Sequence, residues 1–440
     1  MVSHPVKAAF GMIVAFGMAA CAAAADWPQF LGPDRDGVAH ESPRLARAWP
    51  ATGPKILWQQ PVGLGYGGAA IYGDSVLLLD RDGNTGDVLR RFNLADGHEV
   101  WRYPYDAPGK IDPPGSRPTP ATDGKMVFSI GLFGQISAVK FGDGSPVWKK
   151  DLLTDWDAHR PPYAVSTSPL LYGDWVIMMP WGRKAALVAY EKATGNVVWT
   201  TPNPKGVNQE YQSPMLMKFD GADMILATGP DGYLIGADAK TGCQLWEQEV
   251  YPKGKMWAHI PSPLPIGDGR IFITGGYSCG SIMFKLTRLT DEEKFKPENQ
   301  GRQYKITKLW ANKNMGTKCA QALLYNGYLY GNSADVGGGL RCVTLDGQVK
   351  WDSKNNQRTF ETGNLIIADG LIFIVQGQTG ELVMAEASPD GYKELGGAPM
   401  LAPPEPWAPP AFKDGKLVIR DMHNIYCLDV TAAANGASGH

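Results

Sequence analysis

Short apolar runs alternate with polar turns along most of the chain. Trp175 to Met179 and Ile271 to Thr274 are two such runs, and turns such as Tyr172-Gly173-Asp174 and Asn326-Gly327 separate others. Long segments with the 3.6-residue period of an amphipathic helix are absent from the sequence. The pattern therefore predicts many short strands that are joined by tight turns.

One short sequence motif recurs within this pattern. A Thr-Gly or Asp-Gly turn is followed by a β-forming run that ends in tryptophan, as in Ala193-Thr194-Gly195-Asn196-Val197-Val198-Trp199. Further copies run from Asp96-Gly97 to Trp101, Asp143-Gly144 to Trp148, Thr241-Gly242 to Trp246, Asp346-Gly347 to Trp351 and, in degenerate form, Asp390-Gly391 to Leu395. Together with Trp58 and Trp310, these positions lie roughly 40 to 65 residues apart, which is the spacing of a repeat architecture.

Each interval between these tryptophans has the same internal order. A small residue and a proline come first, then three short apolar strands, the glycine turn and the strand that ends in tryptophan. The junctions of small residue and proline include Thr119-Pro120, Ser168-Pro169, Ser213-Pro214 and Ser262-Pro263. Four short antiparallel strands at this period are typical of propeller blades. We therefore predict an all-β, eight-bladed β-propeller of four-stranded antiparallel blades over residues 55–430.

The two ends of the repeat region predict how the ring closes. The last repeat, Pro409 to Val430, contains three strands, and the N-terminal strand at Ile56-Leu57-Trp58 is expected to complete it. The charged insertion Asp291 to Gln303 is expected to lengthen the hairpin between the third and fourth strands of its blade. Residues 26–54 form a lead-in segment whose aromatic residues are expected to pack across the domain, and residues 431–440 form a flexible tail.

Residues 1–25 predict a signal peptide. Lys7 precedes an apolar run from Ala8 to Ala20, which is short for a membrane-spanning helix. Cleavage after Ala23-Ala24-Ala25 is one interpretation. Met18-Ala19-Ala20-Cys21 is similar to a lipoprotein signal, and the second interpretation is therefore a signal that ends before a lipid anchor at Cys21. Both predict an exported protein that is periplasmic or associated with the outer membrane.

Composition and cysteine usage exclude several classes of protein. The chain is 44% hydrophobic and 20% charged, so it can form a large core, and its formal net charge of −2 argues against a nucleic-acid partner. The 6 cysteines are scattered without a Cys-x-x-Cys pair, so the sequence supports neither a disulfide framework nor a zinc motif. Cys279 and Cys319 fall on one predicted face, which raises the hypothesis of a disulfide between them. We expect a monomer.

The repeat resembles that of a known family. Ala237-Asp238-Ala239-Lys240-Thr241-Gly242 to Trp246 is similar to the pyrroloquinoline-quinone (PQQ)-like propeller repeat, whose family includes quinoprotein alcohol dehydrogenases and the outer-membrane assembly lipoprotein BamB. The lead-in Trp27-Pro28-Gln29-Phe30-Leu31-Gly32-Pro33 is similar to that of exported, mostly uncharacterised bacterial members. The repeated glycine and tryptophan positions are turn and packing positions, so the resemblance implies a fold rather than a function.

The resemblance also implies what a quinoprotein site would need. Enzymes of the family hold PQQ with a calcium ion, acidic and amide ligands, and commonly a disulfide between adjacent cysteines. This chain has no Cys-Cys pair and is short for those enzymes. Calcium takes six or more oxygen ligands, and Asp82, Asn84, Asn332 and Asp335 lie in glycine-rich turns of different repeats. We therefore predict no catalytic residue, no metal and no cofactor, with PQQ and Ca²⁺ as the alternative.

The candidate ligand-binding residues lie in loops on one face of the predicted ring. Because strand direction alternates, the turn between the second and third strands shares a face with the crossing to the next blade, opposite the glycine turns. The aromatic and charged side chains there predict a funnel mouth that binds a ligand. The candidates are Tyr66, Arg117, His159, Tyr163, Trp181, Arg183, Trp257, His259, Lys318, Glu361 and Trp407.

Two features of this face have alternative interpretations. Trp181-Gly182-Arg183-Lys184 indicates either a grip for an anionic or aromatic ligand or an exposed turn. His159, His259 and His423 belong to different blades, so we expect hydrogen-bonded loop residues rather than a shared metal site.

The sequence therefore predicts an exported PQQ-like propeller that acts as a binding or scaffolding protein in the cell envelope. Its nearest functional analogy is the outer-membrane assembly lipoprotein of the same family. Its partner is an envelope protein, a small molecule or a glycan. The alternative is a PQQ-dependent alcohol or sugar dehydrogenase with the cofactor in the central funnel. A carbohydrate-binding role is a third hypothesis, which rests on Trp181, Trp257 and Trp407. The sequence contains neither a Gly-x-Ser-x-Gly elbow nor a Walker loop.

Overall fold

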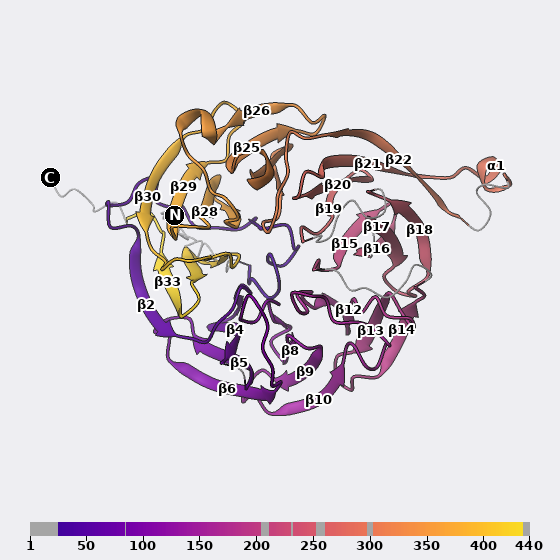
Figure 1. Cartoon of the computed structure of the whole chain (residues 1–440), viewed down its shortest axis with the longest axis horizontal. Coiled ribbons are helices and arrows are strands. Elements are labelled where there is room, and N and C mark those ends of the chain that lie inside the picture. Colours follow the sequence, from indigo (N-terminus) through magenta and orange to yellow (C-terminus); the bar gives the residue numbers. More distant parts are fainter. Residues whose placement is uncertain are drawn as a thin grey trace, which may run out of the picture.

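Eight antiparallel sheets form a closed ring in the computed structural model, which describes residues 25–83, 85–203, 211–229, 232–251, 260–296 and 302–433. Viewed down the ring axis, the sheets radiate from a central channel as the blades of a propeller (Figure 1). This arrangement confirms the predicted all-β, eight-bladed fold. Among the described residues, no helix is long and apolar enough to cross a membrane.

The blades are numbered here in chain order of their innermost strands, and each is listed from the channel outwards. Blades 1 to 4 consist of β3 (Ala70–Tyr72), β4 (Ser75–Asp82), β5 (Gly86–Asn93) and β6 (Glu99–Asp106); β7 (Ala121–Thr122), β8 (Met126–Ile130), β9 (Gln135–Lys140) and β10 (Pro146–Asp151); β11 (Leu170–Tyr172), β12 (Trp175–Met178), β13 (Leu187–Glu191) and β14 (Val197–Thr201); and β15 (Met215–Phe219), β16 (Ala222–Gly229), β17 (Tyr233–Asp238) and β18 (Gln244–Glu249).

The second half of the ring repeats this order. Blades 5 to 8 consist of β19 (Leu264–Gly267), β20 (Arg270–Gly275), β21 (Gly280–Arg288) and β22 (Tyr304–Asn312); β23 (Leu323–Tyr325), β24 (Tyr328–Ser333), β25 (Gly339–Thr344) and β26 (Val349–Asp352); β27 (Leu365–Ala368), β28 (Leu371–Val375), β29 (Glu381–Glu386) and β30 (Glu394–Pro399); and β31 (Ala411–Lys413), β32 (Lys416–Arg420), β33 (Asn424–Asp429) and β2 (Lys55–Pro61).

The ring closes through the N-terminal strand, as predicted. Strand β2 pairs antiparallel with β33, and Trp58 lies opposite Cys427 in the register. Strands from the two ends of the repeat region thus share blade 8, which leaves no unpaired gap between the first and last repeats.

The core lies between neighbouring blades, and this explains the apolar runs in the sequence. Seven of the eight residues of β4 are buried, because both faces of this middle strand pack against adjacent blades. The outer strand β6 instead alternates between exposed and buried positions. Every outer strand also shows a register shift just before its tryptophan or the equivalent position. Such bulges twist an exposed edge and hinder edge-to-edge association.

Most of the repeated tryptophans dock on the glycine turn of the next blade. The indole N–H of Trp148 donates to the carbonyl of Lys192 at 2.8 Å, and its ring lies 2.7 Å from where a Cβ on Gly195 would be. The same N–H to carbonyl bond joins Trp58 to Leu94, Trp101 to Phe141, Trp310 to Leu345 and Trp351 to Ser388. The glycine and tryptophan of the repeated sequence motif therefore form a contact between neighbouring blades.

The lead-in segment enters the central channel. Trp27 forms a bridge with Ile71 of β3, and the carbonyl of Pro28 accepts from the backbone N–H of Thr122 in β7. Gln29 Oε1 accepts from the N–H of Leu171 in β11 at 3.1 Å. Figure 1 shows this segment, drawn in indigo, crossing the middle of the ring.

The lead-in leaves the channel alongside blade 7. Strand β1 (Val38–Ala39) pairs in parallel with β27, so it runs towards the face that carries the glycine turns. The segment also begins on that face, since Asp26 Oδ1 accepts from the N–H of Gly73 in the turn between β3 and β4. The lead-in therefore enters and leaves by the turn face and forms a plug in the channel.

The insertion extends one hairpin beyond the ring. Strands β21 and β22 form a long ribbon, and the short helix α1 (Asp291–Lys294) begins at Thr290, which forms a capping box with Glu293. Figure 1 shows the ribbon and α1 projecting outwards from blade 5. Residues 297–301 of the insertion lie outside the described residues, as do residues 1–24 of the signal peptide and 434–440 of the tail.

We predict that alanine at Gly195 destabilises the propeller more than alanine at Gly173. Both glycines have positive φ, of 72° and 53°, so both changes strain the backbone by about 1 kcal/mol. A Cβ on Gly195 would also displace Trp148, which adds roughly 1–3 kcal/mol, whereas a Cβ on Gly173 meets nothing within 4 Å. Thermal unfolding should show the larger drop in midpoint for Gly195→Ala. Equal drops would contradict the docking role of the tryptophan.

Candidate functional site

A cavity of about 280 Å³ lies at the end of the channel opposite the glycine turns. Most of its walls come from the segments that cross from one blade to the next, and Phe30 of the lead-in plug also lines it. We call it the mouth cavity. Its other lining residues are Tyr66, Pro113, Arg117, Thr119, Tyr163, Ser166, Ser168, Tyr211, Ser213, Ile260, Ser262, Tyr277, Lys318, Cys319, Gln321, Asn364, Trp407 and Pro409.

A belt of hydrogen bonds links blades 1 to 6 along the wall of the mouth cavity. The backbone N–H of Thr119 donates to Ser168 Oγ at 3.0 Å, the N–H of Ser168 to Ser213 Oγ at 2.9 Å, and the N–H of Ser213 to Ser262 Oγ at 3.0 Å. At its ends the belt continues from Gly68 to Thr119 and from Ser262 to Gln321. Thr119, Ser168, Ser213 and Ser262 are the residues that precede proline at the junctions between repeats. Each side chain satisfies a buried backbone N–H of the preceding blade.

One wall of the mouth cavity is formed by Tyr66, Arg117 and Trp407. The rings of Tyr66 and Trp407 lie 5.5 Å apart between centroids, and the Arg117 guanidinium lies 5.5 Å from the Tyr66 ring. The Tyr66 hydroxyl donates to Glu405 Oε2 at 2.9 Å. Burial, with this carboxylate as the second cause, raises the pKa of Tyr66. The hydroxyl therefore stays protonated at neutral pH.

The backbone around the cavity positions these side chains. Arg117 donates from Nη1 to the carbonyl of Gly115 at 2.6 Å and from Nη2 to that of Pro113 at 2.7 Å. Trp407 Nε1 donates to the carbonyl of Gly377 at 3.0 Å, and Asn364 Nδ2 donates to the carbonyl of Trp407 at 2.6 Å. The wall is therefore built from rings and cations that their own loops hold in place.

The opposite part of the lining contains three tyrosines and a lysine. Tyr163 and Tyr211 have ring centroids 5.9 Å apart, and Tyr163 donates its backbone N–H to the Tyr211 hydroxyl at 3.3 Å. Lys318 Nζ lies 5.1 Å from the centroid of the Tyr277 ring. Burial raises the pKa of Tyr277 to about 12 and that of the neighbouring Cys319 thiol to about 11.

The structure brings five of the predicted site residues together. Tyr66, Arg117, Tyr163, Lys318 and Trp407 all line the mouth cavity. Tyr277 and Phe30 line it too and were not among the candidates. Tyr277 follows the second strand of its blade, so the same rule that selected the other loops could have found it. The route of Phe30 through the channel has no counterpart in the repeat pattern.

The other predicted candidates lie elsewhere or outside the described residues. Trp181 is 1% exposed and belongs to the core between blades 3 and 4, so it is neither a ligand grip nor an exposed turn. Arg183 is exposed and pairs with Asp157 at 3.1 Å. His159 and Glu361 do not line the mouth cavity. Trp257 and His259 fall in residues 252–259, which are not described.

The cysteine hypothesis is not supported. The structure contains no disulfide between Cys279 and Cys319. Cys319 lines the mouth cavity, whereas Cys279 packs against the core cluster that contains Met215 and Tyr251.

The described lining does not fit a calcium-held quinone. It contains no Asp or Glu side chain, and the amide oxygen of Gln321 already accepts from the N–H of Ser262. Asn364 therefore has the one side-chain amide oxygen of the described lining that no inter-blade bond uses. Calcium needs several converging oxygen ligands. Of the turn residues considered for this role, Asp82, Asn332 and Asp335 do not line the cavity, and Asn84 is not described.

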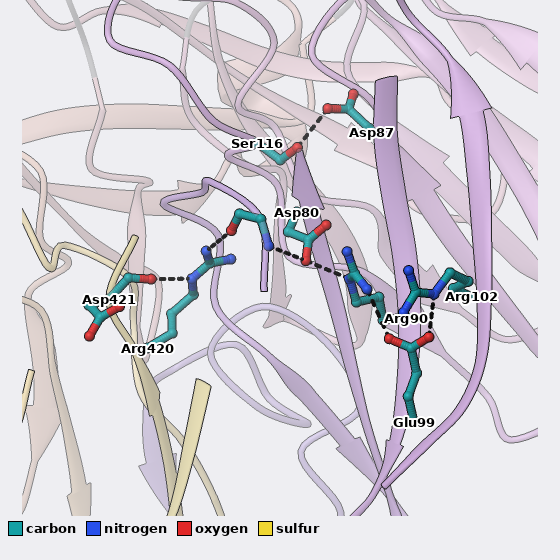
Figure 2. Close-up of polar contacts among 9 residues, drawn as sticks. Asp80, Asp87, Arg90, Glu99, Arg102, Ser116, Arg420 and Asp421 are labelled. Atoms are coloured by element: carbon teal, nitrogen blue, oxygen red, sulfur yellow. Dashed lines mark hydrogen bonds and ion pairs between the residues drawn. The ribbon is translucent and has the colours of Figure 1, made fainter. Parts of the chain in front are cut away.

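A buried polar network lies behind the wall that carries Tyr66 and Arg117 (Figure 2). Ser116, the neighbour of Arg117, accepts at its carbonyl from the N–H of Tyr66 at 2.6 Å. Its hydroxyl donates to Asp87 Oδ1 at 2.7 Å, and Arg81 forms an ion pair with the same carboxylate at 3.1 Å. This contact fixes the Tyr66 loop and the Arg117 loop against each other.

The rest of the network joins blade 8 to blade 1. Arg90 Nε donates to Asp80 Oδ2 at 2.6 Å, and the N–H of Gly63 donates to the same oxygen at 2.9 Å. The carbonyl of Gly63 accepts from Arg420 Nη2 of blade 8 at 2.7 Å. Figure 2 shows these groups in one line, from Asp421 through Arg420 and Asp80 to Arg90 and Glu99. The network thus supports the site where the ring closes.

The chain is similar to PQQ-like propellers in part of its sequence and in its fold. The sequence profile of the family described as outer membrane protein assembly factor BamB matches residues 84–293. The crystal structure of BamB from Moraxella catarrhalis superposes on this chain with a TM-score of 0.60 at 13% sequence identity. The match covers 88% of this chain and 100% of the BamB chain. No curated protein matches the chain by sequence.

Two further solved structures have similar scores. The quinohemoprotein alcohol dehydrogenase ADHIIG from Pseudomonas putida HK5 has a TM-score of 0.58 at 11% identity and covers 94% of this chain and 82% of its own. The computationally designed Ika8 protein has a TM-score of 0.57 at 10% identity and covers 86% of this chain and 100% of its own. At these identities the likeness shows the fold alone.

We predict that Arg90→Met destabilises the protein far more than Arg102→Met, although both arginines contact Glu99. Loss of Arg90 leaves the fully buried Asp80 carboxylate without its ion-pair partner, which should cost roughly 3–5 kcal/mol. Arg102 is 59% exposed, and its loss should cost less than about 1 kcal/mol. Urea unfolding measures the difference. Equal midpoints would show that the buried pair does not stabilise the ring closure.

Proposed function

We propose that this chain, whose resemblance to PQQ-like and BamB-like propellers is confirmed, is a binding protein of the bacterial cell envelope that takes its ligand in the mouth cavity. The observation that carries the proposal is the cavity itself. It is concave, lined by five aromatic side chains besides Phe30, and backed by the lead-in plug. Such a pocket, with a few placed polar groups among apolar walls, is the usual form of a small-molecule site.

The chemistry of the lining supports binding rather than catalysis. A general acid or base works best with a pKa near the operating pH. Burial raises the pKa of Tyr277 to about 12 and that of Cys319 to about 11, away from neutrality. Histidine and carboxylate side chains are missing from the lining that the structure describes. The groups that face the ligand are thus suited to hold it and not to exchange protons with it.

The position of the lead-in supports an orientation in the envelope. Asp26 is held at the turn face by Gly73 and by Lys413, whose ammonium lies 2.5 Å from Asp26 Oδ1. A lipid on Cys21 would lie within about 18 Å of this point, because an extended residue spans about 3.5 Å. The turn face would then point to the membrane and the mouth cavity away from it. Mass spectrometry of the mature N-terminus distinguishes a lipid-modified Cys21 from cleavage before Asp26.

We predict that filling the mouth cavity with a larger side chain abolishes ligand binding. A library of small molecules and glycans is screened by thermal shift against the wild type and Ser166→Trp, which places an indole in the wall of the cavity. Compounds that stabilise the wild type and not the variant support the proposal. Stabilisation of both proteins by the same compounds would overturn it, as would a screen without a ligand.

The same variant tests the dehydrogenase alternative. PQQ with Ca²⁺ is titrated into both proteins while absorbance and dye-linked alcohol oxidation are followed. Stoichiometric PQQ binding with turnover in the wild type, lost in Ser166→Trp, would replace the binding-protein proposal with an enzymatic one.

A further inference from the structure

We infer that the ligand of the mouth cavity is an organic anion with an apolar or aromatic body. The inference rests on the proposed function, because it assumes that this cavity is the binding site. It deepens that proposal by selecting a chemical class from the small molecules, sugars and cations that an aromatic pocket could accept.

Two cations line the mouth cavity without a carboxylate partner among the described residues. Lys318 lies over the Tyr277 ring, and Arg117 lies over the Tyr66 ring and donates to two neutral carbonyls. In the part of the chain that the structure describes, neither side chain forms an ion pair. The rings of Tyr66 and Tyr277 thus each have a cation of the protein over one face, so a cationic ligand at these rings would meet repulsion.

A third positive charge lies next to the base of the cavity. Arg35 of the plug is 1% exposed, and its guanidinium lies 5.4 Å from the centroid of the Phe30 ring. It donates from Nη1 to the carbonyl of Pro169 at 2.7 Å and to Gln29 Oε1 at 3.3 Å, both of which are neutral acceptors. Its Nε is buried and has no acceptor within the described residues. A buried charge of this kind is favoured by an anion nearby.

The burial of Arg35 does not remove its charge at neutral pH. Desolvation lowers the pKa of Arg35 to about 9, which still leaves the guanidinium mostly protonated at pH 7. Charges within low-dielectric walls interact more strongly than in water, and a recess lined by one sign of charge concentrates ions of the other sign.

The nearby carboxylates are bound to other groups. Glu405 accepts from the Tyr66 hydroxyl, Asp87 pairs with Arg81, and Asp335 accepts from the backbone N–H of Ser278. None of the three lines the cavity. The side chains that line the cavity thus carry positive charge at Arg117 and Lys318 and no negative charge, so a carboxylate, sulfonate or phosphate group within it would pair with these two cations.

The walls indicate what the rest of the ligand is. The rings of Phe30, Tyr66 and Trp407 present apolar surface to the cavity, and the serine hydroxyl oxygens of the belt already accept bonds between blades. A flat or apolar body fits such walls. A neutral sugar could stack on the rings but would form no ion pair with Arg117 or Lys318.

Naphthalene-2,6-dicarboxylate and its neutral counterpart naphthalene-2,6-dicarboxamide provide the test, with glucuronate and glucose as a second matched pair. Calorimetry on the full mature chain should show binding of the dicarboxylate at least tenfold tighter than that of the dicarboxamide. Raising the salt concentration should weaken the binding of the dicarboxylate and leave the binding of the dicarboxamide unchanged. Equal affinity of the charged and neutral members in both pairs would overturn the inference.

Lys318→Met identifies the charge that is responsible. This variant should lower the affinity for the dicarboxylate roughly tenfold and leave the affinity for the dicarboxamide unchanged. The control Lys184→Met removes a lysine outside the cavity and should change neither affinity. An equal loss for both probes in Lys318→Met would also overturn the inference. If neutral compounds bind the wild type and not Ser166→Trp while no anion binds, the proposed function stands and the inference fails. If nothing binds in the cavity, both fail.

Discussion

The stacking of one blade's tryptophan on the glycine turn of the next is the contact on which the rest of the molecule depends. The indole needs a flat surface without a Cβ, and its N–H needs a carbonyl, and turns such as Gly97 and Gly195 provide both. Because five tryptophans repeat this bond, neighbouring blades meet at similar positions around the outer rim. A ring closes only when those positions are maintained from blade to blade.

The inner rim has its own set of repeated contacts. The belt from Gly68 to Gln321 links blades 1 to 6 in turn, each junction through a side-chain acceptor and a backbone N–H. Its hydroxyls are therefore structural, although they line the mouth cavity. The groups that remain to contact a ligand are the aromatic rings and cationic side chains of the segments that cross from one blade to the next. The scaffold thus separates the groups that hold the ring from the groups that face the ligand.

The lead-in plug makes the channel asymmetric. It fills the channel from the turn face and contributes Phe30 to the cavity lining and Arg35 beside it. The plug is bound by residues of several blades, including Ile71, Thr122 and Leu171. A charge on the plug thus acts on a site whose loops are spread along the chain from Tyr66 to Trp407. The buried network around Asp80 and Arg420 supports the same site from the ring closure.

The sequence by itself determined the fold, because every repeat has to satisfy the same local requirements. Thr194-Gly195 to Trp199 contains the turn and packing residues of one blade, and the number of such motifs predicted eight blades. The sequence also predicted that the N-terminal strand, β2, completes the last blade. It also placed Tyr66, Arg117, Tyr163, Lys318 and Trp407 on the correct face, since strand direction alternates. Only the tertiary structure decided that Trp181 is core and that Phe30 and Arg35 belong with the cavity. Those outcomes depend on how deep a loop lies and where a non-repeating segment runs, and contacts between distant segments have no local pattern.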